Sequence, residues 1–203
     1  PAMEALFRNV EPDLDVSYIV AQHLSPDHDS ILREIIASFA PLPAVAIEDR
    51  MRMQPRIVYV VPPGKTAHIR NQTIFLEQRT GVTHISNVVD TLFRSLSEAM
   101  GRQCIGIVLS GAGSDGSSGI RLIKEAGGLT IAQDSDSAAF SSMPDMARQS
   151  TEIDLVLQPE FMGAAIARYV ELIRDSEELD EDLESILDRV TNMIQDQRGP
   201  AFS

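Results

Sequence analysis

Several residue types that often reveal a function are scarce in this sequence of 203 residues. There is no Trp, and aromatic residues make up only 5%, which argues against stacking surfaces for bases or sugars. The single cysteine, Cys104, excludes an internal disulfide and is typical of a buried thiol in a reducing compartment. No segment approaches the roughly 20 apolar residues of a membrane-spanning helix, and the N-terminus lacks a signal-peptide pattern. We therefore predict a cytoplasmic protein without membrane insertion.

Basic residues are also few. The sequence has 17 Lys and Arg against 30 Asp and Glu, which gives a formal net charge of −13. Nine acidic residues and only one basic residue, Arg174, lie between positions 171 and 188. Such a charge repels nucleic acid and anionic lipid at long range, so we expect neither as a partner. The acidic run itself is typical of a solvated helix face.

Short apolar runs rich in β-branched residues alternate with helical patterns along most of the sequence. Strands are predicted at 16–21, 45–47, 57–61, 105–109, 129–132 and 153–157, and helices at 2–9, 28–39, 87–100, 117–126 and 160–174. Several of the apolar runs are continuous, as in strands covered on both faces. This alternation predicts an α/β fold with a doubly wound, mainly parallel sheet and flanking helices. Two alternating runs around Asn71-Gln72, from Thr66 to Glu77, predict a β-hairpin.

The two ends of the sequence depart from this alternation. A helical pattern begins at residue 2 with no strand ahead of it, whereas a helix of a parallel sheet is normally entered from a strand. We therefore expect the first strand and its loop to be missing. Apolar residues beyond position 171 recur at spacings of three, four and seven, which predicts an amphipathic helix. The sequence is accordingly divided into a domain at 1–170 and a helical extension or linker at 171–203.

Two of the predicted strands end in residues suited to catalysis. Sites in doubly wound folds form beyond the carboxyl ends of the strands. One strand leads to His23, and another leads into the glycine-rich loop 110–119, which contains Asp115. An ionised Asp near a helix N-terminus can orient a His and stabilise its imidazolium form. These are two members of a Ser-His-Asp triad, although each residue taken singly is more often a satisfied polar group or a helix cap.

The glycine loop also permits a dinucleotide-binding interpretation. Gly111, Gly113 and Gly116 form a G-x-G-x-x-G pattern between a strand and a helix, and Asp134 follows eighteen residues later. Against this interpretation, Asp115 would place negative charge where a pyrophosphate binds. Asp134 also suits a turn. From the residues alone, both interpretations remain open.

A metal site is not expected from the sequence. His23, Asp27, His28 and Asp29 cluster, but their spacing fits no standard metal motif. We therefore predict neither a metal nor a cofactor.

Several segments resemble landmarks of the chemotaxis protein-glutamate methylesterases of the CheB type, in the same order and spacing. They are 21–28, 59–64, 109–116, 123–134 and Met143-Pro144, within a resemblance that covers roughly residues 2–158. The resemblance assigns the glycine loop to the triad Asp rather than to a nucleotide. It implies a hydrolase that removes methyl esters from glutamates of chemoreceptor cytoplasmic helices during adaptation, and some members also deamidate receptor glutamine.

The resemblance also assigns roles to residues. His23 matches the general base and Asp115 the residue that orients it, while the nucleophilic Ser, in a Gly-x-Ser-x-Gly-Gly loop, would precede Pro1. The chain as given is then expected to be catalytically incomplete. Ser25, Ser114 and Ser117 are poor substitutes, because each sits on a loop that already places His23 or Asp115. Two further departures are Ala112, where many members have Met, and the lack of a receiver domain for phosphorylation control.

The last residues resemble a connector. The segment from Leu183 to Ser203 is similar to the link between this esterase and a receptor methyltransferase in CheB–CheR fusion proteins. The expected partners are therefore methylated chemoreceptor helices and a fused methyltransferase domain. An alternative of another class is a non-catalytic domain that binds receptor helices or regulates the methyltransferase. Because a missing central strand leaves neighbouring strand edges unpaired, we also expect this chain alone to self-associate.

Overall fold

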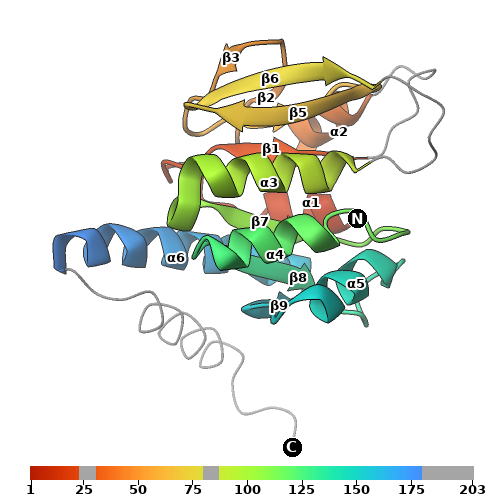
Figure 1. The fold of residues 1–203 in the computed structure, drawn as a ribbon, viewed down its shortest axis with the longest axis vertical. Coiled ribbons are helices and arrows are strands. Elements are labelled where there is room, and N and C mark those ends of the chain that lie inside the picture. The colour runs from red at the N-terminus through yellow and green to blue at the C-terminus, as the bar shows by residue number, and fades with distance from the viewer. Residues whose placement is uncertain (23–30, 80–86, 180–203) are drawn as a thin grey trace, which may run out of the picture.

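The computed structural model describes residues 1–22, 31–79 and 87–179. Helices and strands alternate through this part of the chain (Figure 1). In chain order they are α1 (Ala2–Phe7), β1 (Tyr18–Val20), α2 (Leu32–Phe39), β2 (Ala44–Ala46), β3 (Met51–Arg52), β4 (Val58–Val60), β5 (Lys65–Arg70), β6 (Thr73–Gln78), α3 (Val88–Met100), the 3-10 turn η1 (Gly101–Gln103), β7 (Ile105–Val108), α4 (Ser117–Glu125), β8 (Leu129–Gln133), α5 (Ser142–Ser150), β9 (Leu155–Leu157) and α6 (Pro159–Leu179).

The described strands form three sheets of three strands each. Two are parallel, with the orders β1-β4-β2 and β7-β8-β9, and the third is antiparallel, with the order β3-β6-β5. The two parallel sheets present their edge strands β1 and β7 to a common cavity. The α/β class and the mainly parallel pairing are thus confirmed, and the parallel part consists of two halves.

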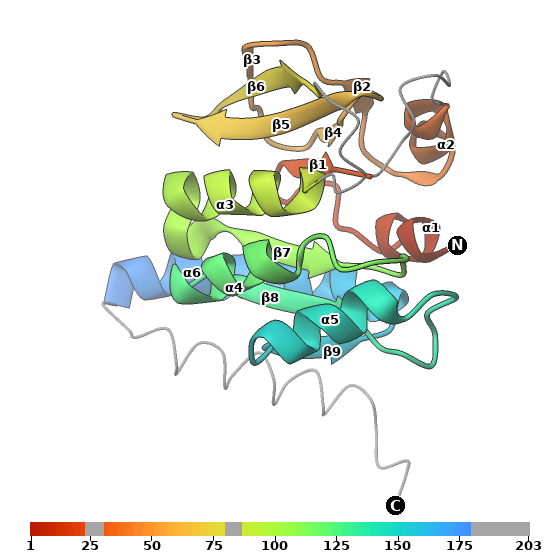
Figure 2. The same cartoon turned by 45° about the vertical axis from the view of Figure 1, so that its right-hand side comes forward.

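Helices cover both faces of these parallel halves. On one face α1, α2 and α6 bury apolar side chains, among them Phe7, Ile36 and Ile166, in a core shared with strands of both halves. On the other face α3, α4 and α5 pack against β7 through a second core that includes Phe93 and Ile123. Figure 2 shows α4 in front of the β7-β8 strands and α6 behind them. This three-layer arrangement explains why all five residues of β8 are buried and apolar runs there are continuous.

The sequence predicted most of these elements, with two omissions. The hairpin is confirmed, because β5 and β6 pair antiparallel and the connecting Asn71 and Gln72 have φ angles of 49° and 59°. The predictions missed the short strand β3 and the helix α5. Helix α5 is mostly polar and contains Pro144, but it buries Pro144 and Ala147, so packing rather than periodicity reveals it. None of the helices in the described ranges has the length and apolar character that a membrane span requires.

Helices α3 and α4 approach each other closely at Gly119. A Cβ at this position would lie 2.6 Å from Cβ of Phe93 and 3.0 Å from Cα of Asp90. These are atoms of, or next to, the backbone of α3, so they cannot move aside as a flexible side chain could. Only glycine therefore permits the observed contact between the two helices.

We expect Gly119→Ala to lower the free energy of unfolding by about 1–3 kcal/mol, because the added Cβ forces α3 and α4 apart. This loss should prevail although Ala favours a helix over Gly by roughly 1 kcal/mol. Chemical denaturation measures the effect. Ser118→Ala, an exposed position on the same turn, is the control and should change stability by less than about 0.5 kcal/mol. Unchanged or increased stability of Gly119→Ala would contradict the close contact.

Candidate functional site

The glycine-rich loop follows β7 at the carboxyl end of its sheet and is held by the segment between β8 and α5. The backbone N–H of Ser110 donates to Oε1 of Gln133 at 2.8 Å, and the N–H of Gly111 donates to the carbonyl of Phe140 at 2.9 Å. The carbonyl of Gly111 accepts from the N–H of Met143 at 3.1 Å. A Cβ at Gly111 would lie 2.3 Å from Sδ of Met143, so a larger residue here would displace the Met143 side chain. The start of the loop is therefore positioned by hydrogen bonds from β8, from α5 and from the segment between them.

Asp115 lies at the end of this loop, just before α4, but its side chain caps α3. Its two carboxylate oxygens accept hydrogen bonds from the N–H groups of Val89, at 2.9 Å, and Asp90, at 3.0 Å, at the start of α3. The side chain of Asp90 in turn accepts the N–H of Gly119, in the first turn of α4, at 2.7 Å. The two aspartates thus cap each other's helices. Since a helix N-terminus favours negative charge, the arrangement holds a carboxylate at this edge of the sheet.

The predicted general base, His23, lies outside the described residues, as do Ser25, Asp27, His28 and Asp29. The strand that leads to His23 can be followed as far as Gln22. Ala21 and Gln22 line the same cavity as Ser110 and Gly111 of the glycine loop. The carboxyl end of β1 therefore borders the loop that carries Asp115, and the role of His23 stays a prediction.

The residues of the dinucleotide interpretation have structural partners. At the start of α4, the N–H of Ser117 donates to the carbonyl of Ser114 at 3.1 Å, and the N–H of Gly119 donates to Asp90. These donors are therefore committed within the protein and are not directed at a phosphate. Oδ1 of Asp134 accepts the N–H of Ser137 at 3.0 Å, which is the turn that its sequence context suggested. Within the described ranges, no group of three or more His, Cys, Asp or Glu side chains could hold a metal ion.

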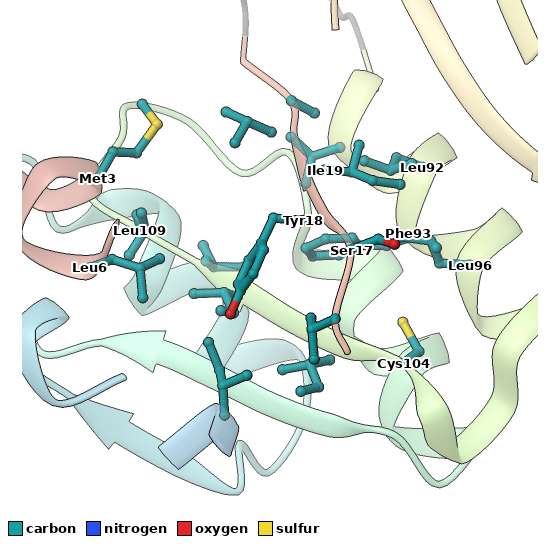
Figure 3. A pocket seen from close by; sticks show the side chains of 18 of the residues that line it. Met3, Leu6, Ser17, Tyr18, Ile19, Leu92, Phe93, Leu96, Cys104 and Leu109 are labelled. Carbon is teal, nitrogen blue, oxygen red and sulfur yellow. The ribbon is translucent and has the colours of Figure 1, made fainter. Parts of the chain in front are cut away.

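A cavity of about 770 Å³ lies between β1 and β7, below the glycine loop (Figure 3). Side chains of α1, α3 and α6 close its sides, and among the lining residues are Leu6, Phe93 and Tyr18. The Tyr18 side chain is only 9% exposed, and its hydroxyl has no hydrogen-bond partner among the described residues. Burial, helped by the charge of Glu11, raises the pKa of Tyr18 to about 12. Burial likewise raises the pKa of the Cys104 thiol to about 12, so this thiol is not an activated nucleophile.

Comparison with known proteins identifies the family. Residues 1–166 match the family model described as CheB methylesterase. The chain belongs to the CheB methylesterase family. This membership confirms the resemblance found in the sequence and favours the assignment of the glycine loop to esterase chemistry over the dinucleotide interpretation.

Relatives of known sequence and structure agree with the CheB assignment. A putative protein-glutamate methylesterase/protein-glutamine glutaminase of Leptospira interrogans is 29% identical over 82% of this chain and 87% of its own length. A protein-glutamate methylesterase/protein-glutamine glutaminase of Anaeromyxobacter dehalogenans is 30% identical over 83% of this chain, which covers 50% of that protein. The crystal structure of the Thermotoga maritima CheB methylesterase catalytic domain matches 84% of this chain with a TM-score of 0.74 at 23% identity, which shows a common fold.

Sequence reasoning missed two residues that position the CheB glycine loop. Gln133, on β8, is 1% exposed and accepts the N–H of Ser110, and Asp90 caps α4. A Gln at the end of a largely apolar run was a usable signal, because a buried polar side chain needs a partner. Asp90 offered no such signal, since an acidic residue in the first turn of a helix ordinarily interacts with its own helix.

The burial of Tyr18 in the cavity predicts how stability depends on pH. Since the folded pKa of Tyr18 is raised to about 12, above an ordinary value of 10.0, its stabilisation is complete below pH 10 and lost as pH rises toward 12. Tyr18→Phe has no phenol to titrate at this position. Between pH 8 and pH 11 the free energy of unfolding should therefore fall by about 1 kcal/mol more in the wild type than in Tyr18→Phe. Denaturant unfolding at both pH values measures the difference.

Tyr59→Phe is the matched control for this comparison. The Tyr59 hydroxyl accepts the N–H of Gln54 at 2.7 Å, so its removal should cost roughly 1 kcal/mol at pH 8 already. Tyr18→Phe, which removes a hydroxyl without a partner, should cost less than Tyr59→Phe at pH 8. An equal alkaline loss in wild type and Tyr18→Phe would mean that the phenol of Tyr18 is accessible to water.

Proposed function

We propose that this chain is the catalytic part of a protein-glutamate methylesterase, in which Asp115 and His23 act with a Ser nucleophile. One observation carries the proposal. The Asp115 carboxylate stands at the N-terminus of α3, beside the end of the strand that leads to His23, in a chain of the CheB methylesterase family. The names of the relatives supply the substrate class, which is a glutamate side-chain ester of a protein.

The contacts of Asp115 suit the role of orienting an imidazole. A carboxylate offers about four lone-pair positions, and the N–H groups of Val89 and Asp90 use two of them. A ring N–H of His23 can use another, which would hold the other ring nitrogen toward the nucleophile. The positive end of the α3 dipole lies beside the Asp115 carboxylate. Asp115 thereby stabilises the imidazolium that forms when His23 accepts a proton.

The reaction then proceeds by acyl transfer. His23 takes the proton of the Ser hydroxyl while the Ser oxygen attacks the ester carbonyl, and the developing oxyanion is held by backbone N–H groups. His23 returns the proton to the methoxide, which leaves as methanol. Water, activated by the same His, hydrolyses the acyl-enzyme to release glutamate and restore Ser. The Ser belongs, in this proposal, to a loop that precedes α1, and an amide substrate releases ammonia by the same steps.

The proposal also covers the substrates, the location and the neighbouring domains. The substrates are methylated helices of chemoreceptors, and the protein acts in the cytoplasm. Further domains are supported by coverage, because the chain spans 50% of the Anaeromyxobacter dehalogenans relative and 14% of an uncharacterised 104.1 kDa protein of Rhodobacter capsulatus. A methyltransferase domain following residues 171–203 fits this picture. The net charge of −13 disfavours nucleic acid as a partner.

Methanol release from a methylated receptor fragment tests the activity. The protein expressed from the start codon of its gene should release methanol, and His23→Ala should reduce the rate by a factor of about 10³ or more. Ammonia release from the unmethylated glutamine form, measured in parallel, separates esterase from deamidase activity. A folded protein that binds the receptor fragment without releasing either product would favour a non-catalytic binding domain.

The two aspartates that cap each other's helices provide a matched pair of variants. Asp115→Asn replaces one of two accepting oxygens with an NH2 group and should lose about 1–3 kcal/mol of stability, whereas Asp90→Asn keeps its accepting oxygen and should lose about 0.5–1 kcal/mol. Only Asp115→Asn should also lower kcat, by a factor of about 10²–10⁴, because it removes the charge that stabilises imidazolium. Asp90→Asn keeps an oxygen that accepts the N–H of Gly119, so the loop should stay in place and methanol release should remain within about twofold. Equal activity losses in both variants would show that Asp115 acts only as a helix cap.

A further inference from the structure

Basic residues gather in one part of this acidic chain. Residues 50–79 carry six basic residues and one acidic residue, a net charge of +5 in a chain of −13. The basic residues are Arg50, Arg52, Arg56, Lys65, Arg70 and Arg79, and the acidic residue is Glu77. This segment contains all three strands of the antiparallel sheet β3-β6-β5. Figure 1 shows β5 and β6 at one end of the molecule and β9 toward the other.

The two faces of the antiparallel sheet differ in character. Ala67, Ile69 and Ile74 are buried in an apolar core that also includes Leu92 of α3. Side chains alternate between the two faces along a strand, so Arg70 projects from the face opposite this core. Arg70 is accordingly exposed. We call this opposite side of the β3-β6-β5 sheet the outer face.

The strand register places two arginines in one row across the outer face. Thr73 on β6 lies opposite both Arg52 on β3 and Arg70 on β5. Residues directly opposite each other on neighbouring strands point to the same face. Because neighbouring strands are about 4.8 Å apart, the Cα atoms of the two arginines are about 10 Å apart, with Thr73 between them.

These two arginines have no acidic partner within the described ranges. The nearby Arg56 differs, since its Nη2 lies 2.8 Å from Oδ1 of Asp15. Arg52 and Arg70 are both exposed and form no ion pair with a described residue. A guanidinium group binds a carboxylate through two parallel hydrogen bonds. The row can therefore bind a partner that presents two carboxylates at a matching distance.

An aromatic pair lies beside this row on the outer face. His68 and Phe75 are opposite each other in the register, and each is two residues from a member of the row. Their rings stack with centroids 5.5 Å apart and an interplanar angle of 12°. Arginine and aromatic side chains are enriched in protein–protein interfaces. The outer face thus fits a protein segment that carries both carboxylates and an apolar side chain.

The charge of the rest of the chain selects the class of partner. Since the whole chain carries −13 and residues 50–79 carry +5, the remaining residues carry −18. A nucleic acid or an anionic membrane extends its negative charge over a wide area and would meet this acidic remainder as well. A protein helix presents its carboxylates locally. Two residues seven apart lie on one face of a helix about 10.5 Å from each other, which matches the spacing of the arginine row.

We propose that the outer face of the β3-β6-β5 sheet docks an acidic helix of the protein substrate, with Arg52 and Arg70 each binding a carboxylate. An apolar side chain of the same helix packs on Phe75. The identity of the partner as the substrate rests on the proposed esterase function. The relatives are named for reactions at protein glutamate and protein glutamine, and both reactions leave a glutamate carboxylate. The processed segment therefore carries the charge that this surface attracts.

The docking surface is separate from the reacting groups. Strand β5 begins after the carboxyl end of β4, whose neighbour β1 leads to Gln22 beside the glycine loop. From Lys65 to Arg70 the strand covers about 17 Å, and in Figure 1 it runs away from the side on which α4 begins. Arg52 and Arg70 therefore act on the binding of a long substrate and not on the acyl transfer itself.

Kinetics with a large and a small substrate test the docking surface. Arg52→Glu and Arg70→Glu are combined in the protein expressed from the start codon of its gene. For methanol release from a methylated receptor fragment, the KM should rise about 10-fold or more while kcat stays within about twofold, because an attraction common to ground and transition states is lost. Hydrolysis of a small ester, the γ-methyl ester of N-acetylglutamate amide, should be unchanged and shows that the variant is folded.

A second double variant is the matched control for charge. Arg8→Glu combined with Arg121→Glu changes the net charge equally, at exposed positions on α1 and α4. This control should leave the KM for the receptor fragment within about twofold of the wild type. An unchanged KM in the Arg52→Glu/Arg70→Glu variant, or an equal rise in the control, would overturn the docking proposal.

Direct binding separates this proposal from the esterase proposal. The glutamate form of the receptor fragment should bind the wild type less tightly as salt rises from about 50 to about 300 mM, and should bind Arg52→Glu/Arg70→Glu about 10-fold or more weakly at low salt. Such binding without methanol release would overturn only the esterase proposal. Methanol release with equal binding by both proteins would overturn only the docking proposal. Binding to a DNA duplex or to phosphatidylserine vesicles that the double variant loses, with fragment binding unchanged, would identify another class of partner and also overturn it.

Discussion

The exchange of helix caps between Asp115 and Asp90 is the constraint on which the arrangement of the site depends. Each carboxylate satisfies N–H groups at the start of the neighbouring helix, and Gly119 lets those helix starts approach. The result fixes the end of the glycine loop relative to α3. Because buried or half-buried helix ends need partners, moving either helix would expose unpaired donors in both. The Asp115 carboxylate therefore has a structural role, and these contacts fix its location.

A second constraint acts from the opposite side of the loop. Its first residues are tied to Gln133 and Phe140, which belong to β8 and to the segment before α5. The loop is therefore held between two helix starts and one strand end, and it forms one wall of the cavity. The cavity and the candidate site share Ser110 and Gly111, so the loop that carries Asp115 also borders the cavity.

Membership of the CheB methylesterase family indicates which reaction this geometry suits. The fold shared with the Thermotoga maritima CheB methylesterase catalytic domain, together with the family match over residues 1–166, makes acyl transfer the chemistry to test first. The wide range of coverage among relatives, from 14% to 87% of their lengths, indicates that domains of this family occur within proteins of very different size.

The sequence by itself determined the α/β class, the approximate helices and strands, and the loop that carries Asp115, because apolar periodicity and glycine spacing are local properties. It did not reveal α5, whose helix depends on the burial of Pro144 and Ala147, nor the partners of Asp115, which lie 25 and 26 residues away. Unpaired strand edges were expected from the missing first strand, but only the structure identified β1 and β7 as the strands with an unpaired edge among the described residues. Which strand edges meet and which donors face a carboxylate depends on how all elements pack together, and only the tertiary structure decided that.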